Sequence, residues 1–189
     1  MGTNAFAEFV ASQQPTPEET EIDWGAERDQ FLRELRVLHE RIGGFLKEFV
    51  ENGSISYKFN DVSLTEDDLG TYSAPRMDIK IGRKTIYLEP MGTLLIGMKG
   101  RVDVVGPAGR AQIFLVNARA KSPADLIKVN IVRIGGNPPV TPRSPSTTPT
   151  SPQEPISWAW KIVTRNPRFG FAELDKESFY TVLMEVAGA

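Results

Sequence analysis

The spacing of large apolar residues changes at Gly53, and this change constrains the fold more than any other feature of the sequence. Between Asp23 and Asn52 these residues recur every three or four positions, as on one side of a helix. From Ile55 onward they alternate with polar residues, as in a half-buried strand. The slower period returns only after Asp175. We therefore predict a helix, then a run of strands, then a second helix.

The first helix is predicted over Asp23–Asn52, with Asp23 as its N-cap and Gly53 as its left-handed stop. Its apolar stripe consists of Phe31, Leu35, Leu38, Ile42, Phe45 and Phe49. Gly43 and Gly44 lie inside it at a cost of about 1 kcal/mol each against alanine, so we expect a bend or the close approach of another backbone. The stripe also has heptad spacing, which leaves two interpretations open: a helix packed on the sheet, and a helix pair across a homodimer.

The segment Met77–Val116 contains three apolar runs separated by turn sequences at Gly82–Lys84 and Gly106–Gly109. This pattern predicts antiparallel strands joined by tight turns. The last run, Arg110–Val116, is apolar on both faces and is expected to be a central strand. Pro90 should end its own strand, because proline has no N–H to donate.

Several less regular stretches are also assigned. Residues 64–75 are predicted to be a polar connection with one turn of helix at 66–69. Gly97 and Gly100 predict bulges or a bend, so the sheet is expected to curve. Ser122 and the proline after it predict one further helical turn.

The C-terminal third is dominated by residues 137–155, of which seven are proline. We predict a mobile loop there, because it cannot bury enough apolar surface to offset the entropy of ordering. Residues 128–134 are predicted to form a short strand before it, and the clean alternation of Ile156–Ile162 predicts a strand after it. The loop is therefore interpreted as an insertion between strands. A last strand is expected within 169–174, followed by a helix capped by Asp175.

Together these elements predict an α+β protein. It has a curved antiparallel sheet of roughly six to eight strands, with the long N-terminal helix and a shorter C-terminal helix packed on one face. The length of 189 residues suits one domain. We assign this domain to residues 22–189 and interpret residues 1–21, of which 12–21 are polar with two prolines, as a flexible leader.

Composition excludes several classes of function. The chain has no cysteine and one histidine, which rules out disulfides, thiolate metal sites and histidine-rich zinc sites. A net charge of -2 gives no general attraction to nucleic acid, so we disfavour that partner. No apolar run reaches the roughly 20 residues that span a bilayer, and the N-terminus lacks the pattern of a signal peptide. We expect a soluble cytoplasmic protein with no membrane partner and no cofactor.

The single histidine, His39, lies beside the apolar stripe of the first helix. Ser/His/Asp catalysis would need a nucleophile and an orienting carboxylate, and the sequence has no Gly-x-Ser-x-Gly elbow. His39 is therefore interpreted as structural, either hydrogen-bonded within the protein or exposed. The stretch Gly92–Gly100 departs from a phosphate-binding loop, because it has an extra residue before Lys99 and no Ser or Thr after it.

Three carboxylates on predicted strands form the candidate site: Asp78, Glu89 and Asp103, with Lys99 nearby. Metal-dependent phosphodiester cleavage needs two or three acidic groups that converge on a divalent cation, and a lysine that steadies the nucleophile. The competing interpretation, which we favour, places these charges on the solvent face of the sheet, where they alternate with core residues.

The stretch Gly100–Asp103, followed by a turn and a strand ending in Asn117-Ala118-Arg119, resembles the restriction-endonuclease-like nucleases. Their pattern is an acid on one strand and acid-x-lysine on the next. Here Asn117 stands in place of the second acid and Arg119 in place of the lysine. These departures remove a metal ligand and the usual catalytic amine.

No coherent catalytic set accompanies the strong core pattern, so we favour a non-enzymatic interaction or ligand-binding protein. A bent sheet over a helix can leave an apolar cleft, and such clefts are common binding sites. The alternative is a metal-dependent nuclease-like protein, active or inactive, that uses the sheet carboxylates.

Overall fold

The computed structural model describes residues 23–93, 97–126, 157–164 and 169–189. Outside these ranges lie three features predicted from the sequence, namely the leader at 1–21, the strand at 128–134 and the loop at 137–155. They stay predictions.

The long N-terminal helix is α2 (Trp24–Glu51), as predicted. Its N-cap is Asp23, whose side chain accepts a hydrogen bond from the Ala26 N–H over 2.9 Å. Beyond its C-terminal end Gly53 has a φ of 78°, a backbone conformation that glycine adopts without strain. The side of α2 that faces the sheet consists of Phe31, Leu35, Leu38, Ile42 and Leu46, all fully buried. The predicted apolar stripe is thus covered within the same chain, by the sheet and, at Phe45 and Phe49, by Phe179 and Tyr180. A homodimer through this helix stays a prediction.

An open antiparallel sheet follows, and its strand order is the order of the chain. Its strands are β1 (Ile55–Glu66), β2 (Gly70–Ile81), β3 (Lys84–Gly92), β4 (Gly100–Gly106), β5 (Gly109–Asn117), β6 (Trp158–Thr164) and β7 (Gly170–Glu173). A short 3-10 helix, η1 (Pro123–Leu126), lies between β5 and β6 in sequence. β5 pairs directly with β6, although residues 118–157 separate these two strands in the sequence.

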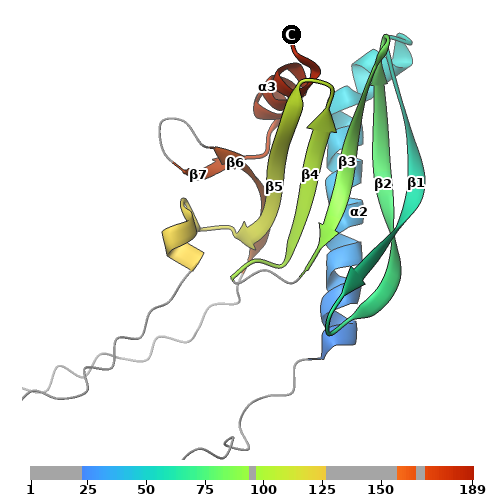
Figure 1. Ribbon diagram of the computed structural model, residues 1–189. Helices are drawn as coiled ribbons and strands as arrows, with labels where there is room; N and C mark the ends of the chain where they lie inside the picture. The colour runs from blue at the N-terminus through green and yellow to red at the C-terminus, as the bar shows by residue number, and fades with distance from the viewer. Residues whose placement is uncertain (1–22, 94–96, 127–156, 165–168) are drawn as a thin grey trace, which may run out of the picture.

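The C-terminal helix α3 (Lys176–Ala187) lies on the same face of the sheet as α2 (Figure 1). It begins at Asp175, which forms a capping box with Ser178. Both helices and the inner face of the sheet contribute to one cluster of buried apolar side chains. Trp160 of β6 belongs to that cluster, and its indole N–H donates to the Glu34 carbonyl over 3.0 Å. The predicted α+β arrangement, with both helices on one face, is confirmed.

The first hairpin is longer than the sequence predicted. β1 continues to Glu66 and β2 begins at Gly70, so the expected polar connection at 64–75, with its turn of helix, is wrong. The two strands pair in unbroken register as far as Glu66 and Gly70, and the hydroxyls of Thr65 and Thr71 lie 3.0 Å apart. The inner face of this part is apolar, because Ala74 is fully buried and Leu64 and Tyr72 pack against the core. The acidic residues 66–68 at the turn made the stretch look like a polar connection.

Two predictions about the middle of the sheet, one at Pro90 and one at Gly100, also need correction. β3 does not end at Pro90 but runs to Gly92, with a register shift between these residues. Its pairing with β2 stops at Leu88, so beyond that point β3 has a partner on one side only, the edge position that proline tolerates. Gly100 opens β4 rather than interrupting a longer strand. A Cβ there would lie 2.6 Å from the Phe31 ring, so this glycine permits the close approach of α2.

Candidate functional site

His39 lies on α2 at the border between its buried and exposed sides. The residue is only 5% exposed, and its Nε2 atom has no hydrogen-bond partner within the described ranges. Its ring packs against Phe59 of β1, with 5.2 Å between the ring centroids. Removal from water lowers the pKa of the imidazole to about 4, so the ring is neutral at neutral pH. The sequence predicted a hydrogen-bonded or exposed histidine, and His39 is neither.

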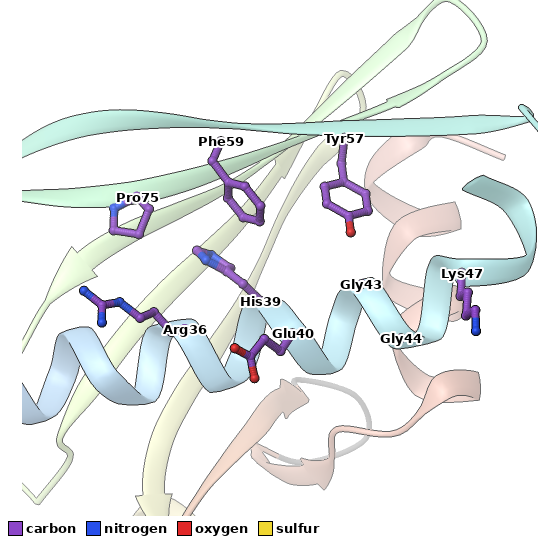
Figure 2. Close-up of a pocket in the computed structure, with 9 residues that line it drawn as sticks. All are labelled: Arg36, His39, Glu40, Gly43, Gly44, Lys47, Tyr57, Phe59 and Pro75. Atoms are coloured by element: carbon purple, nitrogen blue, oxygen red, sulfur yellow. The ribbon is translucent and has the colours of Figure 1, made fainter. Parts of the chain in front are cut away.

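His39 lines a cavity between α2 and the β1–β2 hairpin, which we term the helix–strand groove (Figure 2). Its volume is about 600 Å³. It is lined by Arg36, His39, Glu40, Gly43, Gly44 and Lys47 from the helix, and by Tyr57, Phe59 and Pro75 from the hairpin. A buried polar atom without a partner costs roughly 1–3 kcal/mol. His39 therefore contributes to the groove wall a buried hydrogen-bonding atom that the described protein atoms leave unpartnered.

The hairpin side of the groove is aromatic. Tyr57 and Phe59 lie two positions apart on β1, so both point to the same face, and their rings meet edge to face with centroids 5.8 Å apart. Both are exposed, although their cross-strand partners Ile79 and Met77 are fully buried. The apolar face of the sheet thus continues past α2 into the groove.

The helix side of the groove has little side-chain bulk, because two of its residues are glycine. A Cβ on Gly43 would lie 3.1 Å from the hydroxyl oxygen of Tyr57. Around the same position on Gly44 no atom lies within 4 Å. The close approach predicted at this glycine pair therefore comes from a side chain and not from another backbone.

Three charged side chains belong to the helix side, but only one turns toward the hairpin. Figure 2 shows the Arg36 guanidinium beneath Pro75, whereas Glu40 and Lys47 turn away from the aromatic residues. Lys47 also lies 3.8 Å from the Glu51 carboxylate. Arg36 has no ion pair with any residue that the structure describes. It therefore places a positive charge at one end of the groove, next to the neutral ring of His39.

The carboxylates predicted from the sequence lie elsewhere, on the sheet face that points away from the helices. Glu89 of β3 and Asp103 of β4 are direct cross-strand neighbours. Asp78 of β2 stands opposite Tyr87, two residues before Glu89. The three acids therefore share one face, and their flanking residues on each strand supply the core.

Arginine side chains hold two of these acids. Arg76 donates to both carboxylate oxygens of Asp78 over 2.7 and 3.1 Å, and Arg101 donates to both oxygens of Asp103 over 2.7 and 2.8 Å. Arg110 adds a contact of 3.1 Å to Asp103. In the described part of the chain no group of three or more acidic or histidine side chains is placed to hold a metal ion. A binding role for the acids stays a prediction.

Lys99, the fourth candidate, lies on the opposite side of the sheet from the acids. Its ammonium pairs with Glu27 of α2 and stands 5.7 Å from the ring centroid of Trp158. The structure therefore does not bring Lys99 together with Asp103 or with the other two carboxylates.

The geometry also separates the residues that carried the nuclease resemblance. Gln112 is the residue opposite Asp103 on β5. Asn117 lies five positions farther along the same strand, which corresponds to about 17 Å. Asn117 instead accepts a hydrogen bond from the Arg119 N–H over 2.9 Å, which is a local turn contact.

Sequence reasoning missed the helix–strand groove. The alternation from Ile55 to Phe59 correctly predicted a strand with one apolar face, but it did not reveal that α2 leaves part of that face uncovered. The available signal was the position of His39 and Gly43 one turn apart on the same side of one helix. A polar ring one turn from a glycine at the border of an apolar stripe indicates a partly buried wall with little side-chain bulk.

Comparison of the chain with protein-family models, with curated proteins and with solved structures finds no match in any of the three. Within the described residues, neither helix combines the length and the apolar character that a bilayer crossing requires. The function is therefore inferred from the chemistry of the site.

Proposed function

We propose that this protein binds a small-molecule ligand in the helix–strand groove and does not transform it. The observation that carries the proposal is the Nε2 atom of His39, which is buried at an open groove without a partner among the described residues. Native proteins leave few buried polar atoms unpaired. A bound ligand would supply the missing hydrogen bond.

The size and lining of the groove suit a small molecule. A volume of about 600 Å³ falls within the roughly 300–1,000 Å³ of typical ligand sites. Such sites combine mostly apolar walls with a few polar groups that orient the ligand. Here Tyr57, Phe59 and Pro75 form the apolar wall, and His39 and Arg36 are the polar groups.

The chemistry of His39 supports binding rather than catalysis. A general base works best when its pKa lies near the operating pH. Burial lowers the pKa of His39 to about 4, which makes the imidazole a weak base at neutral pH. A neutral imidazole still has one nitrogen that donates and one that accepts a hydrogen bond. It can therefore orient a ligand without exchanging a proton with it.

A fragment screen read by amide NMR tests the proposal. Isotope-labelled protein is titrated with a library of small aromatic and aliphatic fragments. Binding is expected to shift the amide resonances of residues 36–47 and 57–59 before any others. Gly44→Phe should abolish these shifts, because the space around a side chain at this position is open and the new ring would occupy the groove.

Glu48→Phe is the matched control, because Glu48 is an exposed residue of the same helix that does not line the groove. It should bind fragments as the wild type does. The proposal fails if hits shift other regions of the wild-type protein, or if Gly44→Phe and Glu48→Phe bind alike. It also fails if a broad activity panel detects turnover that a groove substitution removes.

A further inference from the structure

We infer that the ligand of the helix–strand groove is a flat aromatic molecule with an anionic group, its ring against Phe59 and its anion on Arg36. This inference rests on the proposed function and adds the chemical class of the ligand. It follows from the aromatic wall, from the position of Arg36 and from the unpartnered nitrogen of His39.

The aromatic wall of the groove favours a flat ring. Phe59 is 51% exposed and stands between Pro75 and Tyr57 along the wall (Figure 2). On the helix side, His39 packs against Phe59, and the adjoining Gly43 has no side chain. A planar ring in the groove can meet the exposed part of Phe59 in an offset or edge-on arrangement, the geometry that aromatic pairs prefer.

Arg36 favours an anionic group on that ring. Its guanidinium lies beneath Pro75 at one end of the groove, while Glu40 turns away and Lys47 lies close to Glu51. The charge that faces the aromatic wall is therefore positive. The planar guanidinium can donate two parallel hydrogen bonds to a carboxylate, phosphate or sulfonate, which gives orientation as well as affinity.

His39 favours a second polar atom on the ligand, one that carries no charge. Its neutral ring offers no charge to an anion, so the anion belongs at Arg36. A hydroxyl or carbonyl oxygen, or a ring N–H, can instead pair with Nε2. The ring of His39 already contacts Phe59, so this polar atom would lie at the edge of a ring stacked there.

Two dyes with closely related aromatic skeletons test the anionic part. Anilinonaphthalene sulfonate carries an anion, and phenylnaphthylamine is its uncharged counterpart. Both fluoresce more strongly when they leave water, so each can be titrated with the full-length protein. We expect the sulfonate to bind about tenfold more tightly than the uncharged dye. Arg36→Gln should weaken sulfonate binding by about tenfold, the loss expected for a charge-assisted hydrogen bond, and should leave the uncharged dye unaffected.

Arg33→Gln is the matched control, because Arg33 is an exposed arginine of the same helix outside the groove. It should change neither affinity. Equal affinities for the two dyes, or equal losses in Arg33→Gln and Arg36→Gln, would overturn the anion assignment and leave the ligand groove intact. If neither dye binds, or if binding survives Gly44→Phe, the groove is not a ligand site and the proposed function fails with the inference.

Discussion

The hydroxyl oxygen of Tyr57 lies 3.1 Å from the position that a Cβ on Gly43 would occupy. The tyrosine of β1 can approach α2 this closely only because residue 43 carries no side chain. One turn of helix and one strand residue thereby set the width of the groove at this end. The adjacent Gly44 has open space at the same position and provides a matched comparison.

Gly44→Ala should stabilise the protein by about 1 kcal/mol, because alanine is the better helix former and its methyl group meets no neighbour. Gly43→Ala gains the same helix propensity but must displace the Tyr57 hydroxyl by a few tenths of an ångström. Its net gain should therefore be smaller or absent. Urea unfolding followed by circular dichroism measures both values. Equal gains at the two positions would contradict the close contact.

His39→Leu should raise the free energy of unfolding at pH 7 by about 1 kcal/mol, because it removes a buried polar atom that lacks a partner. The same substitution should weaken ligand binding in the groove. His39→Gln, which keeps a polar group, is the control and should retain part of the affinity. A destabilised His39→Leu variant would show that Nε2 is satisfied in the folded protein.

Stability should fall in acid over a range that His39 defines. The imidazole has a pKa of about 4 when folded and 6.5 when unfolded. The unfolded chain therefore takes up this proton first, and stability decreases as pH falls from 6.5 toward 4. The loss amounts to about 3 kcal/mol in full. Urea midpoints across this range should decline in the wild type and decline less in His39→Leu.

Carboxylates whose pKa values are lowered affect the stability of the protein at lower pH than His39 does. Hydrogen bonds from backbone N–H groups lower the pKa of Asp125 and of Asp175 below the ordinary 3.8. Their contribution is present above pH 3.8 and is lost below it, in the wild type and in His39→Leu alike. The difference between the two pH profiles therefore isolates His39. Parallel profiles between pH 6.5 and 4 would mean that the histidine is not desolvated.

Asp103→Asn should destabilise the protein by about 2 kcal/mol, because Asp103 is fully buried and neutralises Arg101 and Arg110. Glu89→Gln is the comparison, since Glu89 is its half-buried cross-strand neighbour and should cost less than 1 kcal/mol. Adding Mg²⁺ should leave the unfolding midpoint of the wild type unchanged. A midpoint that rises with Mg²⁺ in the wild type and not in Asp103→Asn would instead support the metal-dependent alternative.

Most of the fold was predictable because its signals are local. Asp23 and Asp175 cap helices through their own side chains, and Gly53 takes a left-handed conformation that few other residues adopt. The distal half of the first hairpin was not predictable from periodicity. Its inward-facing residues Leu64, Tyr72 and Ala74 are few and are interrupted by the acidic turn at 66–68, so their alternation is too short to stand out in the sequence.

The candidate site was less predictable, because it depends on how two elements meet. Phe59 reads as a core residue on alternation alone, and only the placement of α2 leaves it half exposed. Asp78 and Asp103 read as free carboxylates, yet each is held by an arginine two positions earlier on its own strand. That i, i+2 spacing is visible in the sequence and indicates a same-face ion pair.

The agreement between strand order and chain order bears on how the protein folds. From β1 to β5 each described strand pairs with the next one across a short turn or loop, so this part of the sheet can grow by successive local pairings, a topology associated with rapid folding. α2 is different, because a nascent chain emerges with this helix before the strands that will cover it. Until the middle strands are synthesised, its apolar stripe has no native cover, and the growing chain is then most vulnerable to aggregation.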